Sequence, residues 1–352
     1  MVYCVKCGAE LPKEANFCPK CGKKVALEGA ARRAGWETDV ENALSSAARS
    51  IEEGFKVAKE SIWDSTRGFT SRRASKKKSF SGALEDETVV FSVENINGPV
   101  KVSSWEKKEY KMDLYIEAGG SSIRDAEINL EELHTDLVET ATDDQKRLEL
   151  VIEKKTDSWR YYSVNVEVTL PSSANVDLDV ASRNGGLFIS NLSGGTARLY
   201  SNNGYLTLED VHYTGITGKT SNGHVNLRDV NADEVELQTS NGRIEGGVEG
   251  KAVKLKTSNG KIYLNLPCMR DGSYKLNSSN GGIEVKVPRG ERAGFNLDLH
   301  TSLSSVYIDL PGMEYYRDRK NSKAARTMDY DAKDTKIRID ASTSMGRIEV
   351  LD

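Results

Sequence analysis

A repeated Asn-Gly dipeptide constrains the fold of this chain more than any other feature of its sequence. Six copies lie in one array, and a Ser or Thr stands three residues before each glycine. An alternating apolar and polar segment follows each copy, as in TSNGHVNL. The glycines recur at steps of 19, 19, 19, 18 and 21 residues, at Gly185, Gly204, Gly223, Gly242, Gly260 and Gly281. Self-similarity at such a period is typical of repeat architectures.

Each repeat predicts two short strands and two turns. Ser, Asn and Gly favour the first turn, where we expect Gly to take positive φ and Asn to tolerate it. Two strands in about 19 residues cannot bury their apolar face alone, but stacked units can, with rungs about 4.8 Å apart. The sequence therefore predicts a mainly β chain with a single-chain β-solenoid over residues 182–352. Equivalent asparagines would then form a hydrogen-bonded amide ladder.

The sequence leaves open an alternative fold for the array and the structure of the regions that flank it. A meander of hairpins also fits, because Asn-Gly is a favoured hairpin turn. A degenerate copy, TSLSSVYI, begins at Thr301, and a last copy, TSMGRIEV, begins at Thr343. Residues 83–181 are strand-rich but irregular around Asn97-Gly98, with a mixed segment that fits a short helix. We interpret this region as an irregular β-strand cap or as the first, wider coils.

The first 25 residues contain two C-x-x-C-G units ten residues apart. Four thiolates in this spacing match the tetrahedral donor set of a structural zinc ion, which would also supply the folding free energy of so short a segment. A redox dithiol would use one C-x-x-C, and a catalytic zinc would keep an open position. We therefore predict a zinc ribbon over residues 1–25 that binds one structural Zn²⁺ through Cys4, Cys7, Cys18 and Cys21. The fifth cysteine, Cys268, is expected to be a small apolar residue at a turn.

Residues 26–82 are predicted to be an amphipathic helix followed by a basic flexible linker. Thr38 and Glu41 form a capping box, and apolar residues then recur every three or four positions as far as Ile62. A run rich in Arg, Lys and Ser follows, up to Lys78. The apolar stripe can pack on a protein partner, on a second copy or on the β domain. Alternatively, residues 38–78 can lie on an anionic membrane surface.

Charge and cysteine content bear on the compartment. The net charge is -4, but residues 1–82 hold 16 Lys and Arg against 10 Asp and Glu, so the rest of the chain is acidic. No apolar run reaches the length of a membrane-spanning helix, and the start of the sequence lacks the features of a signal peptide. Paired C-x-x-C units fit a reducing compartment. We expect a cytoplasmic protein, with the inner membrane face as a peripheral location.

Several of these segments resemble known families. Residues 2–24 are similar to the short zinc-ribbon domains found at prokaryotic N-termini. The run VENINGPVKVSSW, the phrase VTLPSSANVDLDVASRNGGLFI and the recurrent TSNGxI resemble DUF4097, a domain of unknown function described as a "putative adhesin", over roughly residues 85–350. The resemblance implies a β-solenoid without a defined biochemical role.

No catalytic motif stands out. Asp210 and Asp229 fall at matching turn positions, but Asn191 and Asn265 take the corresponding places elsewhere, as expected of turn formers. The four histidines share no motif spacing. We predict a non-enzymatic scaffold or protein-interaction protein, with the zinc ribbon as adaptor and with a protein partner or self-association. The alternatives are a membrane-surface binding module and an adhesin or carbohydrate-binding solenoid using outward Tyr205 and Tyr263. Nucleic-acid binding is not expected, and the sequence identifies no small-molecule substrate.

Overall fold

The computed structural model describes residues 2–3, 10–11 and 72–352, the last range with gaps at 85–87, 143–144, 155–160, 268–269 and 289–292. The chain divides into two units, Met1–Ser45 and Ser46–Asp352. In the first unit, β1 (Val2–Tyr3) and β2 (Glu10–Leu11) pair antiparallel. The predicted helix after Thr38 lies outside the described residues. Within those residues no helix has the length and apolarity needed to cross a membrane.

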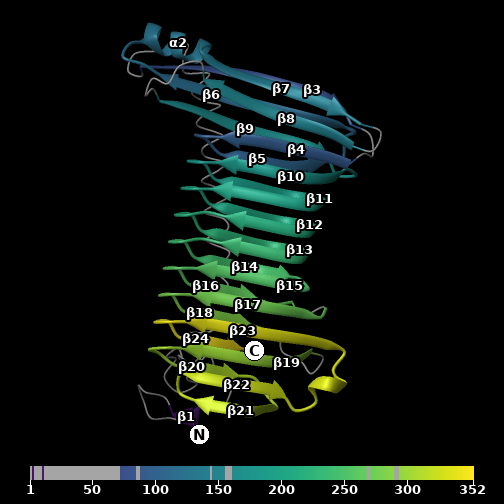
Figure 1. The fold of residues 1–352 in the computed structure, drawn as a ribbon, viewed down its shortest axis with the longest axis vertical. Coiled ribbons are helices and arrows are strands. Elements are labelled where there is room, and N and C mark those ends of the chain that lie inside the picture. Colours follow the sequence, from purple (N-terminus) through teal and green to yellow (C-terminus); the bar gives the residue numbers. More distant parts are fainter. Residues whose placement is uncertain are drawn as a thin grey trace. The chain divides into compact units, whose positions relative to one another are not determined.

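The repeats of the second unit stack as a parallel β-solenoid (Figure 1). Leu187, Leu206 and Val225 occupy equivalent positions in successive rungs, which pair parallel and in register one repeat apart. The predicted solenoid is therefore confirmed, and the hairpin meander is wrong for this array. The rungs are built from β10 (Asn175–Ser182), β11 (Leu187–Ser201), β12 (Leu206–Lys219), β13 (Val225–Gln238), β14 (Ile244–Glu249), β15 (Ala252–Thr257), β16 (Ile262–Asn265), β17 (Gly272–Ser278) and β18 (Ile283–Lys286).

The inner side of each rung is apolar because the strands alternate. In β12, for example, Leu206, Leu208, Val211 and Ile216 are all buried. The alternation shifts by one position at Asp210, whose φ of 50° turns the chain so that Val211 faces inward again. Each long strand therefore bends around the core instead of running straight, and the apolar residues of neighbouring rungs form one continuous core.

The array glycines serve a different purpose from the one predicted. Among the described glycines only Gly98, Gly246 and Gly312 have positive φ, so the array glycines are not left-handed. Instead, a Cβ on Gly242 would lie 1.8 Å from the carbonyl oxygen of Gly223 in the preceding rung. The corner of one rung therefore rests directly on the backbone of the next, and only a residue without a side chain fits there.

The first rungs do not follow sequence order. Strands β4 (Thr88–Asn95) and β5 (Val100–Trp105) pair parallel with β10 and β11 on one side. On the other side they pair parallel with β8 (Gln145–Lys154) and β9 (Tyr162–Pro171). The segment that was interpreted as a cap or as first coils contains both: β4 and β5 make a rung around Asn97-Gly98, and the later strands cover it.

The cap begins earlier in the chain than predicted. Residues of the expected flexible linker form β3 (Arg73–Ala83), which pairs antiparallel along its whole length with β6 (Glu109–Gly119). Lys77 forms an ion pair with Asp113 at 3.3 Å, and Lys78 forms one with Asp136 at 2.8 Å. The prediction of a flexible linker is therefore wrong for residues 73–82. These residues form a paired strand, and basic side chains on it have acidic partners on neighbouring strands.

Two further elements complete the cap. The predicted short helix is α2 (Ile123–Glu131), which is capped by Ser122 and contacts β3 and β6. After it, β7 (Leu133–Ala141) pairs antiparallel with β8. In Figure 1 these elements lie at one end of the stack, the end that is built from the earlier part of the chain.

The other end of the stack also departs from sequence order. The last strands of the chain, β23 (Thr335–Thr343) and β24 (Ile348–Leu351), insert between β17–β18 and the rung made of β19 (Ala293–Thr301) and β20 (Val306–Asp309). The copy at Thr343 therefore stacks on the array, and the degenerate copy at Thr301 lies beyond it. A hairpin of β21 (Met313–Arg319) and β22 (Ser322–Thr327) pairs with β19, and the short 3-10 helix η1 (Tyr330–Ala332) precedes β23.

The glycine requirement gives a direct stability test. Gly242→Ala should lower the free energy of unfolding by about 3 kcal/mol or more, because its methyl group meets the backbone of the neighbouring rung. Gly215→Ala is the matched control, since a Cβ there has no atom within 4 Å. It should change stability by less than about 1 kcal/mol. Urea unfolding followed by circular dichroism measures both, and equal losses would refute the backbone contact as the reason for glycine.

Candidate functional site

The predicted zinc ligands Cys4, Cys7, Cys18 and Cys21 lie outside the described residues, as does Cys268. The described hairpin of β1 and β2 occupies the stretch around the first C-x-x-C unit. Four thiolates are the donor set that a closed structural zinc site uses, so the residues present suit the metal. The assignment of these ligands remains a prediction. In the ranges that the structure describes, no group of three or more His, Cys, Asp or Glu side chains could hold a metal ion.

The asparagines of the Asn-Gly corners form the predicted amide ladder. Each Nδ2 donates to the Oδ1 of the asparagine in the preceding rung at 2.6–2.7 Å. All of these bonds point the same way along the stack. The ladder runs through Asn97, Asn184, Asn203, Asn222, Asn241, Asn259 and Asn280. It ends at Asn280 because Met345 takes the equivalent place in the next rung.

A row of buried hydroxyl groups lies behind the ladder. The Thr239 hydroxyl, for instance, donates to the carbonyl oxygen of Gly223 in the preceding rung and accepts from the Gly242 N–H of its own turn. Equivalent pairs of bonds recur in the neighbouring rungs. Within the stack these polar groups bond to one another, so the repeated motif is a structural element.

The two aspartates that were considered for catalysis have a backbone role. Asp210 and Asp229 both have φ of 50°, and Asn191 at the same turn has φ of 55°. Short polar side chains are the ones that tolerate this left-handed conformation. Asn265 does not share the turn, since the register places it beside Gly247, one position earlier. Turn geometry explains the recurrence of Asp at these positions.

The four histidines are dispersed, and His224 is the one that directly follows an Asn-Gly corner. Its ring stacks on Tyr205 with the ring centroids 5.3 Å apart, and its Nδ1 accepts from the backbone N–H of Arg243 at 3.0 Å. Burial, and then the neighbouring Arg243, lowers the pKa of His224. The side chains that follow the Asn-Gly corners therefore contact one another along the stack axis.

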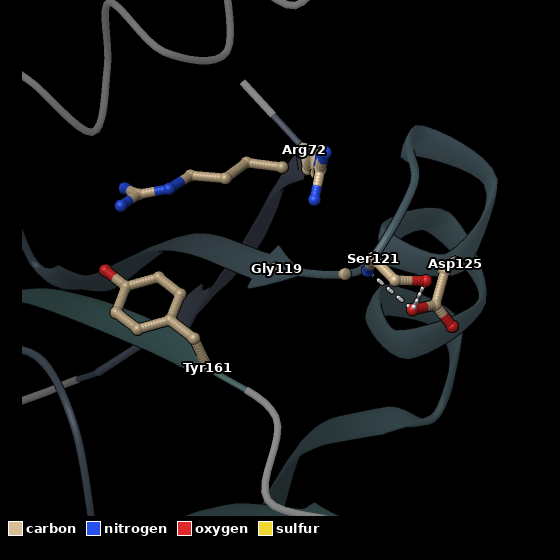
Figure 2. A pocket seen from close by; sticks show the side chains of 7 residues that line it. Arg72, Gly119, Ser121, Asp125 and Tyr161 are labelled. Carbon is tan, nitrogen blue, oxygen red and sulfur yellow. Dashed lines mark hydrogen bonds between the residues drawn. The ribbon is translucent and has the colours of Figure 1, made fainter. Parts of the chain in front are cut away.

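One hollow lies where the chain enters the cap. It has a volume of about 660 Å³ and is lined by Arg72, Arg73, Gly119, Gly120, Ser121, Asp125 and Tyr161 (Figure 2). Arg73 is engaged by Glu117 at 2.7 Å and lies 4.8 Å from the centre of the Tyr161 ring. The Asp125 carboxylate accepts from the backbone N–H and the hydroxyl of Ser121. A carboxylate of the protein thus already occupies the start of α2, where an anion would otherwise bind.

A second hollow, of about 510 Å³, lies over Gly282 on the face that follows the Asn-Gly corners. Its charged side chains are Lys261, Glu284, Arg347 and Glu349, with Tyr263 alongside. Glu284 and Glu349 are direct neighbours in adjacent rungs. Burial raises the pKa of Glu284, and the Glu349 carboxylate raises it further. Tyr263 was predicted from the sequence as an outward residue, whereas the four charged residues were missed. Lys261 and Glu284 lie in the same and the next rung as Tyr263, but Arg347 and Glu349 become their neighbours only because β24 inserts next to β18.

Comparisons with known proteins agree with this architecture. A family model described as Toastrack DUF4097 matches residues 111–351, and one described as a zinc-ribbon domain matches residues 3–25. No curated protein matches the chain.

Solved structures with a similar arrangement are distant in sequence. A "putative adhesin" from Bacteroides fragilis is 12% identical, with 78% of this chain and 97% of that chain covered and a TM-score of 0.37. One from Parabacteroides merdae is 11% identical, covering 79% and 97%, with a TM-score of 0.36. A "putative cell adhesion protein" from Clostridium sporogenes is 11% identical, covering 78% and 99%, with a TM-score of 0.30. At these TM-scores the family match, and not the neighbours, carries the assignment.

The metal prediction can be tested on the whole chain. We expect reduced, purified protein to contain one zinc ion per chain, and Cys7→Ala or Cys18→Ala to lose it, because three thiolates leave the site open. Cys268→Ala is the matched control and should keep full occupancy. Elemental analysis with inductively coupled plasma mass spectrometry measures the ratio. Zinc loss in Cys268→Ala, or none in the ribbon variants, would contradict the assignment.

The raised pKa of Glu284 predicts a pH-dependent gain in stability for Glu284→Gln. The fold disfavours the charged carboxylate, so at pH 7 the wild type is destabilised relative to the glutamine variant. The gain should shrink as the pH falls and vanish below about pH 4, where the carboxyl is protonated in both states. Urea midpoints at pH 7 and pH 4 measure the difference.

Glu209→Gln serves as the control for that measurement. Glu209 lies on the same face but is paired with Arg228, so its replacement should bring no gain at pH 7. A gain of the same size in both variants would show that loss of any acidic side chain, and not the Glu284–Glu349 contact, is responsible.

Proposed function

This chain belongs to the Toastrack DUF4097 family, and from that premise we propose that it is a non-enzymatic scaffold for protein contacts. The solenoid is the rigid part, and the N-terminal zinc ribbon is the adaptor. Binding of a protein partner, or of a second copy, is the activity that this arrangement suits.

The observation that carries the proposal is the fixed arrangement of the outward side chains. Parallel in-register pairing aligns equivalent residues of successive rungs in columns along the stack. Neighbours in a column pair with each other, as Glu236 does with Lys254 at 2.6 Å and Glu209 with Arg228. Such a surface is organised before any partner arrives, and preorganisation reduces the entropy cost of association.

The proposal also includes a role for the zinc ribbon and a location for the protein. Four thiolates bind zinc only while they stay reduced, which favours the cytoplasm. A closed Cys4 site has no open position for chemistry, so its contribution is a folded surface. We therefore propose that the ribbon contacts protein and that the solenoid holds it.

Fewer basic residues are available to contact an anionic membrane than the sequence indicated. Lys77 and Lys78 are paired with Asp113 and Asp136 in the cap, so they contribute less to attraction by anionic lipid. Only residues 38–72 then remain for such a contact. Sedimentation of the full chain with vesicles of phosphatidylserine and phosphatidylcholine separates the two roles, since scaffold function predicts no salt-sensitive lipid binding.

Partner capture with matched variants tests the scaffold itself. Tagged full chain should recover a defined set of proteins, or its own untagged copy, and Cys7→Ala/Cys18→Ala should lose them because the ribbon cannot fold without zinc. Cys268→Ala should behave as the wild type. Quantitative mass spectrometry of the eluates provides the measurement. Recovery of the same partners by all three proteins would rule out the ribbon as adaptor.

A truncated chain gives a second test, and the structure fixes where it must begin. The cut has to precede Arg72, because β3 starts at Arg73 and pairs with the whole of β6. A chain that starts at residue 72 should keep its solenoid and lose the partners. Retained partners would locate the binding surface on the solenoid.

A further inference from the structure

The hollow over Gly282 arises from a break in a column of long side chains. Lys261, Gly282 and Arg347 occupy equivalent positions in three successive rungs, directly before Ile262, Ile283 and Ile348. The two basic residues are therefore about 10 Å apart along the stack axis. Glycine between them leaves a gap whose floor is the backbone of β18 and the turn before it.

The next column forms one wall of the gap. Tyr263, Glu284, Glu349 and Tyr307 follow one another in register, so two carboxylates lie between two tyrosine rings. Arg347 is paired with Glu349 at 3.0 Å, whereas no ion pair in the described ranges engages Glu284. Glu284 is half-buried and lies near Lys261 and Lys286 without an ion-pair contact to either, so its carboxylate faces the hollow as a hydrogen-bond acceptor.

The opposite wall is the end of the amide ladder. Asn259 and Asn280 both line the hollow. Every ladder bond points the same way, so the Oδ1 of Asn280 is the last acceptor of the series, and Met345 offers it no amide in return. Hydrogen bonds in a chain polarise one another, which strengthens the terminal acceptor.

The charges in the hollow cancel. Lys261 and Arg347 balance Glu284 and Glu349, so the site as a whole has no preference for a cation or an anion. It combines hydrogen-bond donors, hydrogen-bond acceptors and one aromatic ring, that of Tyr263, within one concave volume of about 510 Å³, which lies in the range of small-molecule sites. A ligand that matches it must be neutral, must both donate and accept hydrogen bonds, and must present an apolar ring face.

We propose that the hollow over Gly282 is a binding site for a neutral saccharide. Sugar hydroxyls would donate to Glu284 and to the Oδ1 of Asn280, and would accept from Lys261 and Arg347. A pyranose ring would pack against Tyr263. This site is separate from the zinc ribbon, so it stands or falls independently of the scaffold proposed above.

The decisive variant fills the gap with a residue type that already occupies the equivalent position in the preceding rung. Gly282→Lys places in the middle rung the side chain that Lys261 has in the rung before. A Cβ at position 282 lies 3.0 Å from the carbonyl oxygen of Arg347, a tight contact that requires the neighbouring backbone to shift by a few tenths of an ångström. Gly247→Lys is the matched control, because it adds the same side chain to the same face outside the hollow, where the nearest atom to a Cβ is 3.8 Å away.

The test uses the full chain and named probes. Isothermal titration and saturation-transfer NMR are carried out with maltose, cellobiose, lactose and diacetylchitobiose, and with galacturonic acid and arginine amide as charged probes. We expect at least one neutral disaccharide to bind with a Kd in the millimolar range or tighter. Gly282→Lys should weaken it at least tenfold, and Gly247→Lys should leave it unchanged.

Two further variants cover the case in which Gly282→Lys does not fold. Tyr263→Ala removes the ring surface and Glu284→Ala removes the carboxylate acceptor, and each should weaken the binding of the same disaccharide at least fivefold. The proposal is overturned if no neutral disaccharide binds the wild type. It is also overturned if only a charged probe binds, or if binding survives in the hollow variants as it does in Gly247→Lys.

Discussion

The contact on which the rest of the solenoid depends is the approach of one Asn-Gly corner to the backbone of the next. The carbonyl oxygen of each corner glycine lies where a side chain of the following glycine would stand. At this distance the asparagine amides reach one another, and the Ser or Thr hydroxyl bridges two rungs at once. One steric condition therefore brings together three sets of hydrogen bonds. From Gly204 to Gly281 each corner glycine has a hydrogen-bond partner for its amide hydrogen and for its carbonyl oxygen, although the chain turns sharply inside a packed structure.

The same contact explains why sequence order and spatial order can differ. A segment can occupy a rung if it offers the inward apolar residues and a corner that accepts its neighbours, wherever it lies in the chain. β4 and β5 meet these conditions although they lie in the chain between the cap strands β3 and β6, and β23 and β24 meet them from the end of the chain. Thr343 donates to the carbonyl oxygen of Gly281, and Thr301 donates to that of Gly346, which defines the order of the last rungs. Insertion at both ends ties distant parts of the chain together.

The predictable features were those that repeat. Spacing and alternation sufficed for the solenoid, the ladder and the inward residues, because each rung meets the same local conditions. The prediction of positive φ for the array glycines was wrong. An Asn-Gly pair considered as a single turn suggests positive φ, whereas glycine is required here by the close contact between neighbouring rungs. β3 was missed because Lys76, Lys77 and Lys78 resemble a solvated charged run, and because Asp113 and Asp136, the partners of Lys77 and Lys78, lie on later strands. The order of the last two copies depends on a chain reversal by β21 and β22 that no local pattern encodes.

The candidate site shows how a regular stack produces a local exception. Two corners carry a second glycine, Gly186 and Gly282, and both interrupt the same outward column. Gly186 lies between Pro99 and Tyr205. The small pyrrolidine ring of Pro99 forms only a low wall on one side of the gap at Gly186. Gly282 lies between Lys261 and Arg347, whose long side chains wall the gap on both sides. The second wall exists only because β24 lies next to β18. The insertion of the final strands therefore creates the hollow, while the glycine merely keeps it open.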